Sequence, residues 1–353
     1  MASSPSNASP RVPILQLNSL ALGYTTPILS TGAPSIKAYN GQTIALLGRN
    51  GCGKTTLLRA IAGLLAPLEG CVIAQDAPIA SLPHRDKARL VAFAPTRHAP
   101  DGNVRVKELV MLARFPHQGW FKTTSPHDYA AVETAMRLTQ TTPFADRRIG
   151  TLSDGERQRV WLAMALAQET PILLLDEPSA FLDFPSKGNL VVFLRHLART
   201  THRLIIYSTH DLQSALWCSD RLWIAHNATL YDTLPEEAAR SGILNAVFGT
   251  ESSTFDPESF TFTLRTKNAS NRPRFRIVSP PEDPDFLYAR RVLLRLGWQE
   301  TISDDPSVIT ITKAQDGAAW RLPDGEQADS LESLSAWAER QGEIIESNEN
   351  LMQ

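Results

Sequence analysis

A glycine-rich segment of this sequence has the residue types and spacing of a phosphate-binding loop. Residues 48–55 read GRNGCGKT, which fits the pattern G-x-x-x-x-G-K-[ST] in full. Glycines let the backbone wrap a phosphate with its N–H groups inward, and the start of a following helix adds about half a positive charge. We expect Lys54 to reach the β- and γ-phosphates of a nucleotide and the Thr55 hydroxyl to bind Mg²⁺. The predicted nucleotide-binding positions of this phosphate loop are Gly48, Asn50, Gly51, Cys52, Gly53, Lys54, Thr55 and Thr56.

The flanking residues distinguish this loop from a chance glycine-rich turn. An apolar run over residues 43–47 predicts a strand before it, and apolar residues at helical spacing predict a helix after it. Both are required for a phosphate loop. The Cys52 thiol inside the loop is interpreted as a bystander and not as a nucleophile.

Two adjacent carboxylates follow a second apolar run. Residues 172–175 are all apolar, and Asp176 and Glu177 come directly after them. A continuous apolar run is typical of a central parallel strand buried on both faces. Alone, the pair also fits an ordinary turn after a strand. Together with the phosphate loop, it predicts that Asp176 holds Mg²⁺ and that Glu177, as general base, polarises the attacking water.

The elements that must position these residues follow from the alternation of short apolar runs and helical periods. From residue 13 to about residue 224 this alternation predicts a layered α/β fold. Core strands are expected at residues 43–47, 90–94, 172–175 and 204–208. Residues 100–149 show helical periodicity without a clear strand, so we expect a helical insertion there.

The whole chain of 353 residues is predicted to contain more than one domain. We expect a disordered tail at 1–12, a main domain at 13–265 with a helical subdomain at about 100–165, and a polar linker at 266–274. Residues 275–353 are expected to form a small α+β domain of β-α-β-β-α order. Its role, whether regulatory, dimer-stabilising or ligand-sensing, is not decided by the sequence. Three tryptophans are expected in its core: Trp298, Trp320 and Trp337.

Composition narrows the class of protein. The net charge is −2 without a long basic run, so we expect no nucleic-acid partner. The three scattered cysteines indicate neither a disulfide framework nor a zinc site, and suit a reducing compartment. The first ten residues lack the features of a signal peptide. No apolar run approaches the roughly 20 residues that cross a bilayer.

With these motifs in place, the sequence from about residue 15 to residue 233 resembles the ATP-binding subunits of ABC transporters. Residues 152–158, LSDGERQ, are similar to the signature of that family, usually LSGGQ. Residues 208–211 resemble its switch-histidine region and residues 179–183 its D-loop. Tyr24 falls where the family places an aromatic ring on adenine. The resemblance implies a P-loop ATPase core with an antiparallel β subdomain, in addition to the helical insertion.

The same resemblance implies how the remaining site residues act. Two copies pair head to tail, so ATP on one copy is covered by the signature residues Ser153, Gly155 and Glu156 of the other. His210 contacts the γ-phosphate, and Asp183 communicates across the dimer. Ser153 and Glu156 also fit a capping box at a helix start, and we expect that structural role as well.

One position departs from the family pattern. The family has a glutamine after the strand at 90–94, where it contacts Mg²⁺ and the membrane subunit. Thr96 occupies that position here. Its hydroxyl can still bind a metal-bound water, but it is shorter than glutamine. Either the substitution is tolerated or the coupling to transport is unusual.

A narrower resemblance concerns the cargo. Residues 106–110 and 114–118, VKELV and RFPHQ, are similar to the helical insertion of importers for iron–siderophore, haem and cobalamin. This implies an ATP-hydrolysing importer motor at the cytoplasmic face of the inner membrane. Its partners would be a separate permease and, indirectly, a periplasmic or lipoprotein substrate-binding protein. The alternatives are an exporter ATPase and a soluble ABC ATPase without a permease. The single cassette, without a coiled coil or zinc motif, argues against the latter.

Overall fold

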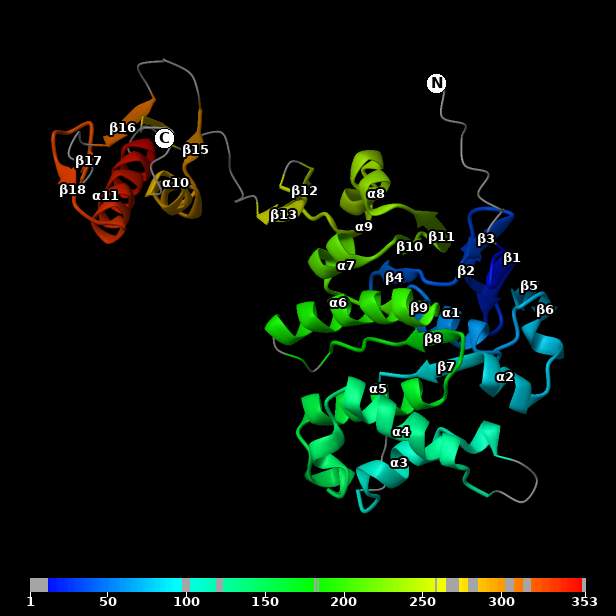
Figure 1. Cartoon of the computed structure of the whole chain (residues 1–353). Helices are drawn as coiled ribbons and strands as arrows, with labels where there is room; N and C mark the ends of the chain where they lie inside the picture. The colour runs from blue at the N-terminus through cyan, green and yellow to red at the C-terminus, as the bar shows by residue number, and fades with distance from the viewer. Residues whose placement is uncertain are drawn as a thin grey trace, which may run out of the picture. The chain divides into compact units, whose positions relative to one another are not determined.

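The computed structural model describes residues 12–96, 102–118, 123–180, 182, 184–257, 259–264, 273–278, 285–301, 308–313 and 319–350. The chain forms two compact units, the first from residues 1–249 and 255–262 and the second from residues 250–254 and 263–353. Each unit is drawn in Figure 1. The expected tail lies outside the described residues except for Val12, and so does most of the expected linker.

A parallel sheet forms the centre of the first unit. Its spatial order is β10-β4-β9-β8-β7, and each neighbouring pair runs parallel. Every residue of β4, β9 and β8 is buried. The four expected core strands are present, but the first residue of the 90–94 strand belongs to helix α2 (His84–Leu90). The strand bounds are β4 Thr43–Gly48, β7 Val91–Ala94, β8 Ile172–Leu175, β9 Leu204–Ser208 and β10 Arg221–His226.

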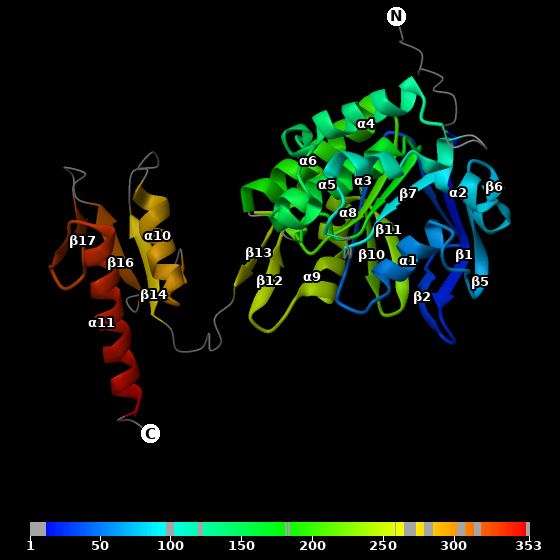
Figure 2. The ribbon, with the colours of Figure 1, turned by 90° about the horizontal axis from the view of Figure 1, so that it is seen from below.

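An antiparallel part continues the same sheet beyond β10 (Figure 2). Strand β1 pairs antiparallel with β2, β3 and β5, and β5 pairs with β6. Strand β11 joins the two parts, since it pairs with β10 on one side and β2 on the other. The expected antiparallel β subdomain is confirmed. Its bounds are β1 Leu15–Gly23, β2 Pro27–Thr31, β3 Ser35–Ala38, β5 Glu69–Ala74, β6 Ala77–Pro78 and β11 Thr229–Thr233.

Side chains of the central strands alternate between two hydrophobic cores, as the two-residue period of a strand requires. On one face, Ile172 and Leu174 pack with helix α1 (Lys54–Ile61) and the antiparallel strands. On the other face, Leu173 and Leu175 pack with the helices of the insertion and with helices that follow β8 in the first unit. These include α6 (Phe184–Thr201), α7 (Leu212–Cys218), α8 (Pro235–Ser241) and α9 (Ile243–Phe248).

The expected helical insertion is present between β7 and β8. Helices α3 (Val106–Leu112), α4 (Pro126–Leu138) and α5 (Asp154–Ala167) lie together in the lower part of the first unit in Figure 1. Helix α4 begins with a capping box of Ser125 and Asp128 and a proline in its first turn. Among the described residues of the insertion, short 3₁₀ turns lie between the helices at Phe115–His117, Thr142–Phe144 and Ile149–Thr151.

The second unit has its own sheet, in the order β15-β14-β16-β17-β18, with α10 (Asp285–Arg295) and α11 (Leu331–Asn350). Its core contains all three expected tryptophans. The expected β-α-β-β-α order is correct in outline, but β15 (Gln299–Glu300) and β18 (Gln327–Ala328) were not expected. Strands of two residues are too short to show alternation. The other strands of the described residues are β12 Ser253–Asp256, β13 Thr261–Leu264, β14 Arg274–Val278, β16 Ile309–Lys313 and β17 Trp320–Arg321.

In the part of the chain that the structure describes, no helix has both the length and the apolar character needed to cross a bilayer.

Candidate functional site

The phosphate loop joins the end of β4 to the start of α1. Gly48, Gly51 and Gly53 have φ angles of 151°, 79° and 99°, which side chains disfavour. A Cβ atom at Gly48 would also lie 2.6 Å from the Cys52 sulfur and 2.8 Å from the Ala225 carbonyl oxygen. Helix α1, which is fully described, starts at Lys54 without a side-chain cap. Its first-turn N–H groups are therefore available to an anion.

Lys54 is buried within this loop, with 7% of its surface exposed. Its ammonium donates to the carbonyl oxygens of Gly48, at 2.9 Å, and Arg49, at 3.3 Å. These bonds hold the cation under the loop that would enclose a phosphate. Asn50 and Thr56 lie in the loop and in the first turn of α1, as the motif requires.

The hydroxyl of Thr55 connects the phosphate loop to the acidic end of β8. It donates to Asp176 Oδ2 at 2.8 Å, across 121 positions of sequence. Asp176 is 4% exposed, and its second oxygen accepts from the Ser208 hydroxyl at 2.6 Å. A hydroxyl and a carboxylate side by side are hard oxygen donors that fit the preference of Mg²⁺. The structure thus brings together two of the three residues predicted to bind the metal.

Glu177 follows with a backbone φ of 50°, an uncommon conformation for a residue other than glycine. Its N–H donates to the Ser208 hydroxyl at 2.8 Å. Its carboxylate oxygen Oε1 lies 2.9 Å from His210 Nε2, and both side chains are partly exposed. The structure therefore brings His210 into contact with Glu177, a contact that the motifs alone did not specify.

Thr96, the third residue predicted to bind the metal, is half-buried just beyond the end of β7. Ala94 pairs with Leu175, and its carbonyl accepts from the Asp176 N–H at 2.8 Å. Extending this parallel register by two residues brings Thr96 level with Glu177. Thr96 thus lies at the same edge of the sheet as the two carboxylates.

The signature segment forms the start of helix α5. The capping box is confirmed: the Ser153 N–H donates to Glu156 Oε2 at 2.8 Å, and the Glu156 N–H donates to the Ser153 hydroxyl at 3.3 Å. The bond from the Ser153 N–H, with that from its hydroxyl and the nearby Arg147, lowers the pKa of Glu156. Among the described residues, these side chains bond within their own turn and to Arg147, not to the phosphate loop. Gly155, in the first turn of α5, is half-buried.

For the other two predicted site residues, Tyr24 and Asp183, the described structure gives no contact that supports the predicted role. Tyr24 lies in the turn between β1 and β2 and is 67% exposed. Asp183 lies outside the described residues.

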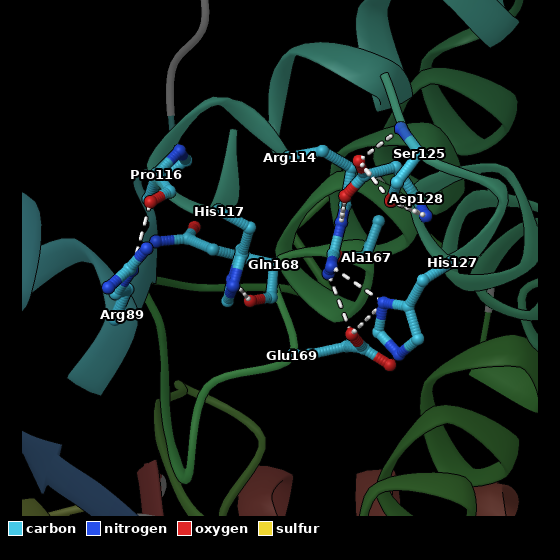
Figure 3. Close-up of polar contacts among 10 residues, drawn as sticks. All are labelled: Arg89, Arg114, Pro116, His117, Ser125, His127, Asp128, Ala167, Gln168 and Glu169. Atoms are coloured by element: carbon cyan, nitrogen blue, oxygen red, sulfur yellow. Dashed lines mark hydrogen bonds and ion pairs between the residues drawn. The ribbon is translucent and has the colours of Figure 1, made fainter. Parts of the chain in front are cut away.

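A buried cation that belongs to none of the nucleotide-site motifs anchors the helical insertion (Figure 3). Arg114 is 1% exposed. Its guanidinium donates to Asp128 Oδ1 at 2.8 Å, to the Ala167 carbonyl at 2.7 Å and to Glu169 Oε2 at 2.8 Å. Burial by itself would raise the pKa of Asp128, but hydrogen bonds from Arg114 and Ser125 outweigh it and lower the pKa to about 2.

The residues after Arg114 extend this anchor to helix α2. Arg89 Nε donates to the Pro116 carbonyl at 2.9 Å, and His117 Nε2 lies 2.7 Å from the Gln168 carbonyl (Figure 3). The segment 114–118 therefore ties α2, α3 and α4 to the end of α5, which leads into β8 and its carboxylates. The sequence pattern related this segment to one subgroup of importers, but it did not predict that the segment joins these helices.

Comparisons with known proteins show which family the sequence resembles. The family model described as ABC transporter matches residues 33–180. The chain is 39% identical over 231 residues to the achromobactin transport ATP-binding protein CbrD of Dickeya dadantii, covering 65% of this chain and 85% of that protein. It is 33% identical, with the same coverage of both chains, to the ferric enterobactin transport ATP-binding protein FepC of Escherichia coli.

Solved structures support the fold. One of a transporter described as metal-chelate type, in an inward-facing conformation, has a TM-score of 0.61 at 24% identity, and the match covers 72% of this chain and 99% of that one. The dimeric cassette MJ0796 has a TM-score of 0.56 at 21% identity, with coverage of 63% and 98%.

Proposed function

This chain belongs to the ABC transporter family and is an ATPase of that family, and from this premise we propose that it drives the import of an iron–siderophore, haem or cobalamin. The hydrogen bond from Thr55 to Asp176 carries the catalytic part of the proposal, because it joins the phosphate loop to the carboxylates. The cargo class is supported by the names of the relatives, which include proteins for achromobactin and ferric enterobactin transport.

Each site residue has a role in this proposal. The loop N–H groups and Lys54 bind the phosphates, and the Tyr24 ring stacks on adenine. Thr55 and Asp176, with Thr96 nearby, would hold Mg²⁺, which when bound would offset charge on the β- and γ-phosphates. Glu177 orients the attacking water and accepts its proton at the carboxylate. His210, 2.9 Å from that carboxylate, orients Glu177 and reaches toward the γ-phosphate.

A second copy completes the site. Ser153 is exposed at the start of α5, where the capping box occupies the Ser153 and Glu156 N–H groups. The helix dipole and the N–H groups of Asp154 and Gly155 are left to favour an anion there. In a head-to-tail dimer, this turn, with Gly155 and Glu156, covers the γ-phosphate bound to the other copy. Asp183 contacts the partner copy. Hydrolysis therefore depends on dimerisation.

The helical insertion is proposed to transmit closure of the dimer to a permease. The motor lies at the cytoplasmic face of the cell membrane, and a periplasmic or lipoprotein binding protein delivers the cargo to the same permease. The main domain at 13–265, the linker at 266–274 and the domain at 275–353 remain our proposed division of the chain.

Reconstitution with a candidate permease for such a cargo tests the proposal. In vesicles, ATP should drive uptake of a labelled ferric siderophore, haem or cobalamin, and the Glu177→Gln variant should abolish uptake. ATP-driven efflux instead would make the protein an exporter motor. If no permease changes the rate of ATP hydrolysis, that result would contradict any coupling to transport.

A further inference from the structure

Ser208 ends strand β9, which lies between β4 and β8 in the sheet. Leu175 of β8 pairs with Tyr207, and Leu46 of β4 pairs with Ser208. The register therefore places Ser208 level with Asp176, between the phosphate loop and the carboxylates. Its exposed fraction is 0%.

The hydroxyl of Ser208 has one proton and two lone pairs, and its contacts determine how it uses them. The Glu177 N–H can only donate, so the hydroxyl oxygen accepts this bond at 2.8 Å. Its single proton is then directed to Asp176 Oδ1 at 2.6 Å. One hydroxyl thus bridges the side chain of the first carboxylate and the backbone of the second.

This bridge restrains both residues that need a defined position. Asp176 has Thr55 on Oδ2 and Ser208 on Oδ1, so the plane of its carboxylate is fixed from two sides. Glu177 has a φ of 50°, a left-handed conformation that is unfavourable for a residue with a side chain and persists only when the surroundings hold it. The bond to Ser208 provides such a restraint at the Glu177 nitrogen.

We propose that Ser208 is a positioning residue for ATP hydrolysis: it sets Asp176 toward the metal and Glu177 toward the attacking water without touching the nucleotide. This inference rests on the proposed roles of Asp176 and Glu177. It assigns a function to a residue that the phosphate loop, signature and switch-histidine motifs leave without one.

The test compares Ser208→Ala with Ser208→Thr, which keeps the hydroxyl, and with Ser219→Ala as a matched control. Ser219 is also buried, and its hydroxyl bonds to the Tyr207 hydroxyl at 2.8 Å, away from the carboxylates. The measurements are kcat and KM for ATP, ATP affinity without magnesium, and the magnesium concentration that gives half-maximal turnover.

Ser208→Ala should lower kcat on the order of 10-fold to 100-fold, the scale of a misplaced reacting group, and should raise the magnesium requirement. ATP affinity without magnesium should stay at the wild-type level, and the threonine variant should recover activity if it folds. Ser219→Ala should keep wild-type kcat. A Ser208→Ala variant with unchanged kcat and magnesium requirement overturns the inference. An equal loss of kcat in Ser219→Ala also overturns the inference, because it indicates a structural effect only.

Glu177→Gln separates this inference from the proposed function. If Glu177→Gln loses turnover while Ser208→Ala does not, only the positioning role fails. If Glu177→Gln turns over like wild type, the assigned general base is wrong, and the inference fails with it.

Discussion

Arg114 and Asp128 form an ion pair inside the helical insertion, with Nε and Oδ1 2.8 Å apart and side-chain exposures of 1% and 5%. Removing one partner of such a pair leaves the other charge buried and uncompensated. Arg114→Met should therefore destabilise the protein by about 3–5 kcal/mol, measured by urea unfolding. The double variant with Asp128→Asn should be less destabilised than Arg114→Met alone.

An exposed pair supplies the control for this measurement. Arg240 and Glu237 bond at 2.6 Å on helix α8, with side-chain exposures of 78% and 49%. Arg240→Met should leave the free energy of unfolding nearly unchanged, because solvent screens exposed ion pairs. Equal losses in the two arginine variants would contradict the role assigned to Arg114.

The pH dependence of stability follows from the same pair. The pKa of Asp128 is lowered to about 2 in the folded protein, against about 3.9 for an unfolded aspartate. A lowered folded pKa contributes stability above the unfolded pKa, and this contribution disappears as pH falls from about 4 to about 2. The stability difference between wild type and Asp128→Asn should therefore shrink over that window in urea unfolding curves. A difference that stays constant from pH 5 to pH 2 would contradict the assignment.

The sequence predicted those candidate site residues whose positions follow from local spacing. Lys54 and Thr55 follow from one contiguous motif, and Asp176 and Glu177 follow from a strand whose carboxyl end had to meet the same edge of a parallel sheet. Ser208 could not be found in this way. Its bridge depends on the register between β8 and β9, and neither strand specifies that register by its own pattern.

The same dependence on distant contacts explains which other structural features the sequence did not predict. Arg114 stood out in the segment RFPHQ, but an arginine in a polar segment is usually exposed. Its burial depends on Asp128 and on the end of α5, which lies more than fifty residues away along the chain. In the second unit, the two-residue strands β15 and β18 are defined by pairing with neighbours and not by a sequence period.

Lys54→Ala should abolish ATP binding. In the proposed site the buried ammonium is the cation that faces the phosphates, and alanine leaves no charge in its place. Isothermal titration calorimetry with MgATP checks this, with Lys37→Ala, an exposed lysine on β3, as the charge-matched control. Unchanged affinity in the Lys54 variant would exclude its phosphate-binding role.

Glu177→Gln should keep ATP binding but lose hydrolysis by about 10²-fold or more, since glutamine cannot accept the proton of the attacking water. Because closed sites then persist, the variant with ATP should elute as a dimer in size-exclusion chromatography. Phosphate release gives the turnover. A variant that hydrolyses ATP slowly yet stays monomeric would argue that the signature residues of a second copy do not complete the site.

Thr96 gives the most specific prediction about coupling. Ala94, two residues earlier, accepts the Asp176 N–H bond, so position 96 lies at the same edge of the sheet as Asp176. In the proposed coupling, a longer side chain there would contact the metal-bound water and the permease. Thr96→Gln should leave ATP affinity unchanged and alter the number of ATP molecules hydrolysed per substrate imported. Thr96→Ala removes the hydroxyl and is compared with Thr96→Gln. Both are measured in vesicles with the permease, as hydrolysis and uptake in the same sample. If neither substitution changes the ratio of hydrolysis to uptake, position 96 has no part in coupling, and the threonine is simply a tolerated replacement.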